Sequence, residues 1–404
     1  MNSRERQYDI VLVGATGFVG RLTAAHLSRS AGEGARIALA GRSPERLAAL
    51  RRELDVPWDT LTVDVDDAAS VDEVAASTRV IASTVGPYAR HGLPLVRACA
   101  RAGTAYADLT GESTFAARSV AEAHATARDT EARIVHSCGF DSIPSDLGVG
   151  LAHAASGGGP LAEATVQVRT IKGGVSGGTI DSLRQQLLDA RSDPSARRVV
   201  SDPYALTPGP SRHLPASSRP RGMRLDETSG IWQAPFVMGA YNQQIVQRTS
   251  YLGGWSYGEL MRYREVVDTT TGVSGRIIAA AVSAATGALV AGLLFPPTRA
   301  ILDRVLPAPG EGPSARTREA GRFTVESDVY PVDGTPTRTR ISAPYDPGYD
   351  GTAVMLGESA LSLAFDDLPS GGGVLTPMAA MGEALAARLR RHRFTVETGP
   401  LPIG

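Results

Sequence analysis

Three glycines at regular spacing form the stretch of this sequence best suited to binding a phosphate. Residues 10–20 read IVLVGATGFVG, an apolar run that breaks at Gly14 and continues through Gly17 and Gly20. A turn without Cβ atoms lets backbone N–H groups approach phosphate oxygens, and the start of a helix adds unpaired donors and a positive dipole end. The last glycine lets that helix pack closely on the strand. The pattern predicts a nucleotide-binding strand, turn and helix.

The residues at the end of the next predicted strand indicate which nucleotide cofactor the protein binds. Residues 36–40 read as a strand that ends in Gly41-Arg42-Ser43-Pro44. Folds that bind NAD place an acidic residue there for the ribose hydroxyls, whereas a guanidinium suits a 2′-phosphate. Arg42 and Ser43 therefore favour NADPH; the alternative is a solvated Arg42 before a Ser-Pro helix start. Asp64, which lies in a third predicted strand at 61–65, either meets the adenine edge or caps the next helix.

Further candidate residues follow the fourth and sixth predicted strands. Gly86-Pro87-Tyr88 comes directly after residues 80–85, and ligands of open α/β sheets lie at the carboxyl ends of strands. We therefore expect this turn to border the nicotinamide side of the cofactor. Asp141 and Ser142 follow the strand at 134–138 and face the same crevice, where they orient a substrate or water, or brace their own turn.

Apolar periodicity predicts the fold that holds these residues. Six strand candidates alternate with helices over residues 1–145, as a doubly wound parallel sheet requires, so we expect an α/β, Rossmann-like NADP-binding domain there. Alternating residues at 164–170, 323–329 and 337–341 predict a second α+β substrate or dimerisation domain, residues 146–371, on a mixed or antiparallel sheet. We expect residues 372–404, with a helix at 378–391 and an edge strand at 394–397, to complete the first domain.

Two segments stand out from this pattern. Residues 193–229 are rich in Pro, Ser and Arg, and a loop that long in an enzyme favours a lid or a substrate border. Residues 277–295 contain no charge and are long enough to cross a membrane. Because Arg276 and Arg299 flank them and soluble-looking segments lie on both sides, we expect a buried or membrane-touching hairpin helix instead.

Composition excludes several function classes. The 404 residues carry a net charge of −1, which gives no electrostatic case for a nucleic-acid partner. Lys172 is the sole lysine and Val168 stands four residues before it, so a YxxxK proton relay is excluded. Two cysteines imply no disulfide framework, and Cys138 is expected to be a small buried residue. The seven histidines show no ligand spacing, so no metal is predicted. The charged N-terminus lacks a signal peptide, which favours the cytoplasm.

Several short motifs together resemble one enzyme family. GATGFVG is followed by AGR at 40–42, VGPY at 85–88, YADLTGE at 106–112 and CGFDSIPSD at 138–146. This set resembles the saccharopine dehydrogenase-like oxidoreductases and, within them, the trans-acting enoyl reductases of actinobacterial lipid synthesis. APFVMGAYNQQIVQRTSYL at 234–252, GEGPS at 310–314 and GGVLTPMAAMG at 372–382 extend the likeness over nearly the whole chain. It implies cofactor contacts at Gly14, Ala15, Thr16, Gly17, Phe18, Gly20, Arg42, Gly86, Pro87 and Tyr88.

The resemblance also implies an activity. It points to an NADPH-dependent reductase of a lipid or polyketide acyl chain, presented by a partner synthase or acyl carrier protein, in a homodimer. The expected peripheral membrane contact comes from the apolar segment 277–295 instead. Enoyl reduction needs a hydride at the β-carbon and a proton at the α-carbon, and Tyr88 is the first candidate donor, unless it only packs over the cofactor. The rival functions are carbonyl or imine reduction on the same fold and a non-catalytic NADPH-binding, lipid-associated protein.

Overall fold

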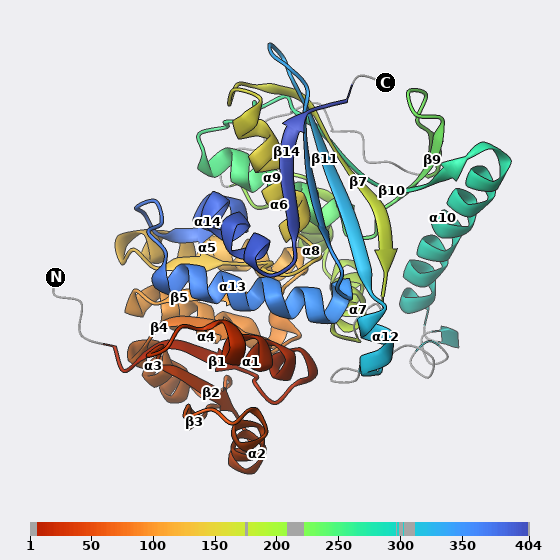
Figure 1. Cartoon of the computed structure of the whole chain (residues 1–404). Helices are drawn as coiled ribbons and strands as arrows, with labels where there is room; N and C mark the ends of the chain where they lie inside the picture. Colours follow the sequence, from red (N-terminus) through yellow and green to blue (C-terminus); the bar gives the residue numbers. More distant parts are fainter. Residues whose placement is uncertain are drawn as a thin grey trace.

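Two seven-stranded sheets organise the part of the chain that the structure describes (Figure 1). The structure is a computed structural model and describes residues 6–173, 177–207, 222–295, 297–298, 302 and 312–402. One apolar core extends from a face of the first sheet, through buried helices, to the second sheet. The two sheets therefore belong to one continuous body.

The first sheet, sheet A, is entirely parallel and has the order β13-β6-β5-β4-β1-β2-β3. The chain moves outward from β1 in one direction and then returns to β4 on the other side, which puts the topological switch point between β1 and β4. This confirms the predicted doubly wound sheet. Its strands are β1 (Tyr8–Val13), β2 (Ile37–Gly41), β3 (Asp59–Thr62), β4 (Thr78–Ser83), β5 (Ala105–Asp108), β6 (Arg133–Val135) and β13 (Gly373–Leu375).

Apolar positions at helical spacing form the helices of sheet A. In α2 (Pro44–Leu54), Leu47 and Leu50 are buried and Ser43 caps the N-terminus, as the Ser-Pro start predicts. The other connecting helices are α1 (Phe18–Ser30), α3 (Ala68–Ser77), α4 (Tyr88–Ala102) and α5 (Ser113–Asp129). A second apolar cluster fills the space between α3, α4, α5 and their face of the sheet.

The second sheet, sheet B, has the order β14-β12-β11-β7-β10-β9-β8 and pairs β7 with β10 in parallel, the other neighbours being antiparallel. The predicted mixed sheet is confirmed. Its strands are β7 (Leu161–Lys172), β8 (Arg224–Leu225), β9 (Ile231–Pro235), β10 (Arg262–Thr271), β11 (Arg322–Pro331), β12 (Thr337–Ala343) and β14 (Thr395–Pro400).

Two buried helices join the sheets. α6 (Ile143–Ala155) packs on β11 and β12, and α13 (Thr352–Phe365) packs on β1, β4 and β5. α13 is buried over almost its whole length because it lies within the layer between the sheets (Figure 1). Residues far along the chain therefore cover the face of sheet A that α1 leaves open.

The C-terminal segment serves both sheets. β13 pairs with β6 at the edge of sheet A, α14 (Pro377–Arg391) packs on α6 and α13, and β14 pairs with β12 at the edge of sheet B. The predicted helix and edge strand are confirmed. β13 joins sheet A, as completion of the first domain by this segment requires, whereas β14 joins the edge of sheet B.

The predicted loop 193–229 contains regular structure. Pro194–Ser201 form a helix, α8, since Asp193 accepts from the Ser195 amide at 2.7 Å and Pro194 starts the first turn. Arg224–Leu225 form β8, and residues 208–221 lie outside the described residues. The loop prediction therefore overlooked a capped helix start.

The apolar helix, α10 (Gly272–Leu294), is longer than predicted and lies on the outside of the molecule (Figure 1). Within the described chain it alone is long and apolar enough to span a membrane, with a mean hydropathy of 2.2. The strands before and after it, β10 and β11, both pair with β7, so the chain returns to the same sheet. Because only 11% of its most apolar window is buried, the buried alternative is wrong, and the membrane-touching alternative stays a prediction.

Candidate cofactor and substrate site

The glycine turn after β1 is built for close backbone approach. Gly14 has φ +85°, and a Cβ there would lie 2.6 Å from Thr84 Oγ1 and 2.9 Å from Val85 Cγ2. Its amide donates to Ala40 O at 2.9 Å, which holds the turn against the end of β2. Only a glycine fits this position without displacing the end of β4.

The start of α1 leaves donors for an anion. A Cβ at Gly20 would lie 2.1 Å from Gly14 O, so the helix packs directly on the turn. Gly17 occupies the N-cap position, and no side chain caps the helix there. The first-turn amides are thus directed toward the space where a diphosphate binds in such folds. The Ala15 amide is already bonded to Ala40 O.

Phe18 contacts the second sheet's side of the molecule. Its ring meets Tyr349 edge-on with centroids 5.0 Å apart, and the Arg318 guanidinium lies over it at 5.3 Å. The side chain therefore anchors the turn to elements that follow β10. Because the Phe18 ring packs against Tyr349 and Arg318, Phe18 would contact the cofactor through its backbone amide. The predicted cofactor contacts at Phe18 and Thr16 both stay predictions.

Two arginines stand at the carboxyl end of β2. Arg42 is exposed, and among the described residues its guanidinium makes no hydrogen bond or ion pair. Arg46, which the sequence reasoning missed, donates to Thr16 O at 3.1 Å. The Ser43 hydroxyl accepts from the Arg46 amide and donates to the Glu45 carboxylate. The glycine turn after β1 has no room for Cβ atoms, and the Arg42 guanidinium beside it is free. Together they fit a dinucleotide that carries a 2′-phosphate.

Asp64 braces a turn. Its carboxylate accepts from the Asp66 amide at 3.1 Å, whereas Asp67 accepts from the Ala69 amide and caps α3. The expectation that Asp64 caps the next helix is therefore wrong, because Asp67, three residues further along the chain, makes that cap. Its exposed side chain is left for the predicted adenine contact, which stays a prediction.

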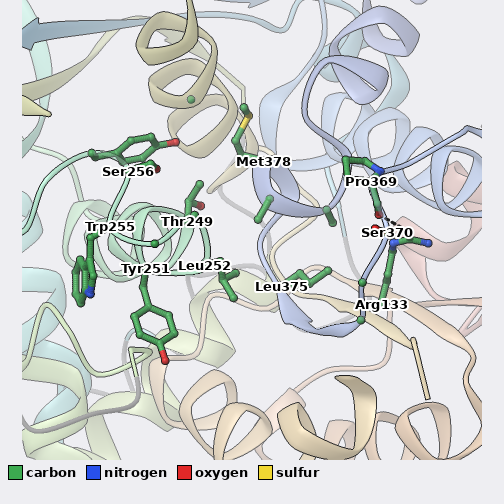
Figure 2. A pocket seen from close by; sticks show the side chains of 18 of the residues that line it. Arg133, Thr249, Tyr251, Leu252, Trp255, Ser256, Pro369, Ser370, Leu375 and Met378 are labelled. Carbon is green, nitrogen blue, oxygen red and sulfur yellow. Dashed lines mark hydrogen bonds between the residues drawn. The ribbon is translucent and has the colours of Figure 1, made fainter. Parts of the chain in front are cut away.

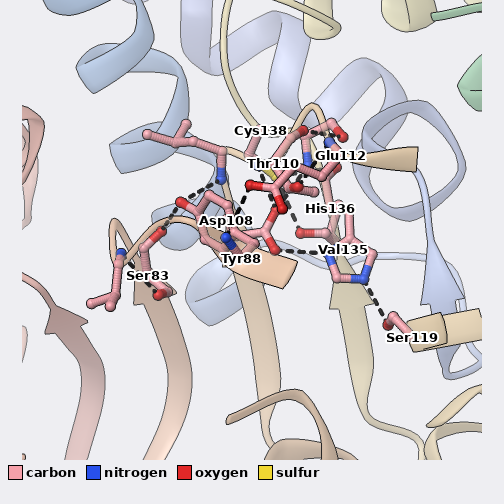
Figure 3. A network of polar contacts seen from close by, with 12 residues as sticks. Ser83, Tyr88, Asp108, Thr110, Glu112, Ser119, Val135, His136 and Cys138 are labelled. Atoms are coloured by element: carbon pink, nitrogen blue, oxygen red, sulfur yellow. Dashed lines mark hydrogen bonds and ion pairs between the residues drawn. The ribbon is translucent and has the colours of Figure 1, made fainter. Parts of the chain in front are cut away.

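Tyr88 is buried and its hydroxyl is fully used. The hydroxyl donates to Ser83 O at 3.0 Å and accepts from the Leu109 amide at 3.2 Å, and the ring packs on Phe115 (Figure 3). Burial raises the pKa of Tyr88 well above its ordinary value. A phenol that donates to a backbone carbonyl inside the protein does not fit the predicted role of proton donor. The geometry makes it a brace for the turn after β4.

Behind this turn lies a buried chain of polar groups (Figure 3). Asp108 bonds His136 Nδ1 at 2.8 Å, and His136 Nε2 lies 2.7 Å from Ser119 Oγ. The other Asp108 oxygen accepts from the amides of Thr110 and Ser137, both at 3.1 Å. The order carboxylate, imidazole, hydroxyl resembles a hydrolase triad, but all three side chains are buried. The group is structural and fixes the ends of β5 and β6.

Glu112 connects the start of α4 to a helix that follows β7 of sheet B. Its carboxylate accepts from the amides of Tyr88 and Ala89, at 3.0 and 2.7 Å, and so caps α4. It also accepts from Ser182 Oγ at 2.7 Å, on α7 (Gly177–Ser192). Burial raises the pKa of Glu112. Since Gln186 of α7 accepts from the Ser113 amide, α7 is held over the ends of β4 and β5.

Asp141 and Ser142 belong to a second polar network. Ser142 Oγ donates to Asn242 Oδ1 at 2.8 Å, and Asn242 Nδ2 donates to Asp141 O at 2.6 Å and to Glu265 Oε1 at 3.0 Å. Asn242 lies on α9 (Gly239–Leu252). Glu265 also accepts from Ser145 Oγ and from the hydroxyl of its strand neighbour Tyr263, each at 2.8 Å.

Glu265 is the titratable centre of that network. Burial, together with the nearby charge of Asp141, raises the pKa of Glu265 to about 7. The sequence reasoning missed both Glu265 and Asn242. Alternation along β10 could have placed Glu265 on the same face as Tyr263. Nothing in the sequence marked Asn242 as its partner.

Two further expectations concern cysteine and metal. Cys138 is fully buried and burial raises the pKa of its thiol, which confirms a small buried residue. The ligand atoms of His26, Glu358 and His392 lie within 4.8 Å of one another, a grouping that sequence spacing did not reveal. Arg388 already pairs with Glu358. The absence of a metal stays a prediction.

Comparison with known proteins now identifies the class. Residues 10–136 match the family model of the saccharopine dehydrogenase NADP binding domain. The structure also matches apo saccharopine dehydrogenase (L-Glu forming) from Saccharomyces cerevisiae with a TM-score of 0.53 and 13% identity, covering 98% of this chain and 100% of that one. The fold is shared, and the chain is an NADP-dependent oxidoreductase whose cofactor is NADPH.

Full-length relatives place the chain within that class. It is 45% identical over 421 residues to a protein of Mycobacterium tuberculosis provisionally named a trans-acting enoyl reductase, covering 98% of this chain and 99% of the relative. It is 44% identical over 411 residues to a trans-acting enoyl reductase of Mycobacterium ulcerans, covering 96% and 97%. The chain belongs to the saccharopine dehydrogenase-like family, in the group of these trans-acting enoyl reductases.

Proposed function

We propose that this protein reduces a carbon–carbon double bond in a lipid or polyketide acyl chain, with NADPH, on a substrate presented by a partner synthase or acyl carrier protein. Identity of 44–45% to relatives with this named activity, along nearly the whole of each chain, carries the proposal. The cradle around Gly14 and the free guanidinium of Arg42 support the cofactor part.

The chain's own residues bind and orient. When bound, NADPH supplies the hydride. The turn from Gly14 to Gly20 would hold its diphosphate through backbone amides, and Arg42 would pair with the 2′-phosphate. Glu112 and Tyr88 fix the turn of Gly86 and Pro87, which borders the predicted nicotinamide side.

Asp141 and Ser142 remain the proposed polar residues on the substrate side. Ser142 holds Asn242, and Asn242 connects the Asp141 backbone to Glu265. A carboxyl group with a pKa of about 7 gives and accepts protons near neutral pH, so this network is the proposed proton reserve for the α-carbon. Ser142 and Asn242 are positioning residues in this scheme.

The partner surfaces are also part of the proposal. Val273 and Ile277 of α10 are 76% and 64% exposed, so we propose that this helix rests on a lipid surface while the protein remains cytoplasmic. A homodimer is proposed from the family resemblance. Light scattering coupled to gel filtration tests the dimer, and flotation with liposomes of the wild type and of Ile277→Ser tests the lipid contact.

Isotope transfer tests the activity. The purified protein is mixed with NADPH deuterated at C4 and with 2-enoyl thioesters of increasing chain length. The proposal predicts a saturated thioester with deuterium on one face of the β-carbon. An alcohol or amine product would assign the carbonyl or imine rival instead. Tight NADPH binding without turnover of any thioester, including those on a carrier protein, would support the non-catalytic alternative.

A further inference from the structure

A second cavity lies apart from the candidate cofactor site, beside the edge strand β13 (Figure 2). Its volume is about 750 Å³, within the range of sites for small organic ligands. Its wall comes from the ends of α5, α6 and α9, the start of α14, and the segments 253–257 and 369–372. None of the residues assigned above to NADPH lines it.

The cavity wall is cationic without a counter-charge. Its lining residues include the guanidinium groups of Arg128 and Arg133 and the neutral imidazoles of His124 and His153, but neither Asp nor Glu. Arg128 is exposed, and its guanidinium makes no hydrogen bond or ion pair within the described chain. Arg133 donates to Pro369 O and so holds one rim in place (Figure 2). Such a wall favours an anion.

A buried arginine behind the wall adds to this charge. Arg248 is 1% exposed, and its guanidinium donates to Val374 O, Leu206 O and His124 Nδ1. Those partners are two carbonyls and an imidazole, with no carboxylate among them. Burial lowers the pKa of Arg248 to about 10. A buried cation without an ion-pair partner is costly, and an anion in the adjoining cavity would offset that cost.

His124 supplies a neutral donor. Burial and the charges of Arg248 and Arg128 lower the pKa of His124 to about 4, so the ring is neutral at neutral pH. Its Nδ1 accepts from the Val374 amide at 3.0 Å, which leaves the proton on Nε2. His124 therefore presents an N–H group without competing as a cation.

The opposite side of the cavity is apolar and aromatic. Figure 2 shows Tyr251, Leu252, Trp255, Leu375 and Met378 around it. Trp255 has φ +62°, a left-handed backbone rarely kept by a bulky residue, and its ring packs on Tyr251 with centroids 5.6 Å apart. Strain of this kind persists where surrounding structure holds a side chain for use.

We propose that this cavity binds an anionic amphiphile, with a phosphate or carboxylate head at Arg128 and His124 and an alkyl or aryl body against Trp255 and Met378. The ligand is distinct from NADPH and from the substrate on the nicotinamide side. The inference therefore does not depend on the proposed reductase activity. Two kinds of head group share this chemistry, and the test separates them.

Calorimetric titration with matched probes tests the proposal. Dodecyl phosphate, dodecanoate, dodecanol and inorganic phosphate are each titrated below their aggregation concentrations. We expect one-to-one binding of dodecyl phosphate or dodecanoate, at least about tenfold tighter than dodecanol or phosphate, because head and chain both contribute. The tighter of the two anions names the head group. Trp255 fluorescence should change with the same midpoint, and Trp255→Phe should remove that signal.

Variants on one helix provide the control. Arg128→Gln should weaken the anionic probe about tenfold, as loss of a charge-assisted hydrogen bond does. Arg118→Gln, on the same helix but paired with Glu122 outside the cavity, should leave the affinity unchanged. Equal affinity for dodecanol, equal effects of the two variants, or displacement of the probe by saturating NADPH would each overturn the proposal. Loss of enoyl reduction would not bear on it.

Discussion

The two halves of the carboxyl edge of sheet A use their polar groups in opposite ways. At β1 and β2, the Arg42 guanidinium and the first-turn amides of α1 have no side-chain partner within the described chain. At β4 to β6, Tyr88, Asp108 and Glu112 are buried, and each side chain is bonded to nearby backbone groups. The first half is left ready for a ligand, and the second half is a rigid support that holds its shape without one.

This difference separates binding from bracing. A free cation lowers its energy only when an anion arrives, whereas a buried carboxylate with several donors stabilises the fold at all times. Substitutions of the exposed side chains in the first half should therefore change cofactor affinity with little effect on stability. Substitutions in the second half should do the reverse.

The largest effect on cofactor binding is expected at Gly20, where α1 packs on the glycine turn. In Gly20→Ala the new Cβ would lie 2.1 Å from Gly14 O, so turn and helix must separate. We expect a loss of about 3 kcal/mol in the free energy of unfolding and no measurable NADPH binding. Gly32→Ala, which meets nothing within 4 Å, is the control and should behave as wild type. Tight cofactor binding by Gly20→Ala would show that the turn does not cradle the diphosphate.

Asp108→Ala tests the bracing half. The substitution leaves His136 and the amides of Thr110 and Ser137 without their acceptor. Urea unfolding should show a loss of about 3–5 kcal/mol, as for one partner removed from a buried charged network. Asp66→Ala, at an exposed site, should change stability by less than about 0.5 kcal/mol. Similar small losses in both variants would contradict a bracing role.

The Glu265 network predicts a pH dependence. Because burial raises the folded pKa of Glu265 to about 7, the folded state holds its proton more tightly than the unfolded chain. Stability is therefore greatest below the ordinary carboxyl pKa and falls as pH rises through 7, by roughly 2–3 kcal/mol for this group. Glu265→Gln should lose correspondingly less stability than wild type between about pH 5 and about pH 8.

Urea unfolding of both proteins at the two pH values measures this difference. Asp146, whose pKa burial raises to about 6, contributes the same trend to both proteins and cancels in the comparison. An identical pH dependence in wild type and Glu265→Gln would mean that Glu265 is not the titrating group.

Among the substitutions of buried residues, Tyr88→Phe should have the smallest effect on stability. It removes a hydroxyl that bonds Ser83 O and the Leu109 amide, for a loss of about 1–2 kcal/mol. The rate of enoyl reduction should change less than about tenfold if the phenol is only a brace. A fall of about 100-fold or more in kcat with normal stability would restore Tyr88 as the proton donor.

Local patterns predicted most of the fold. The apolar run of β1, the Ser-Pro start of α2 and the alternation in β11 and β12 each depend on neighbours in the sequence, and each prediction agrees with the structure. Pairings across long separations could not be read this way. Examples are β14 joining β12 and α13 covering sheet A, since both depend on the packing of distant segments.

In the candidate site, too, local patterns were predicted and contacts between distant segments were not. The glycines after β1 carry a local spacing signal, so their cradle was predicted from sequence. Whether Tyr88 faces a ligand or the core depends on Ser83 O and Leu109, which no spacing reveals. Glu265 and Asn242 come together from β10 and α9 for the same reason. Sequence thus located the binding half better than the bracing half.

Calorimetric titration with NADPH and NADH shows whether Arg42 binds the 2′-phosphate. The proteins compared are wild type, Arg42→Ala and, as a control on the same side of sheet A, Arg51→Ala. We expect wild type to prefer NADPH and Arg42→Ala to weaken NADPH binding about 10- to 100-fold while leaving NADH binding and stability unchanged. Arg51→Ala should match wild type for both. Equal affinity of wild type for the two nucleotides, or equal weakening of both by Arg42→Ala, would contradict a free cation poised for the 2′-phosphate.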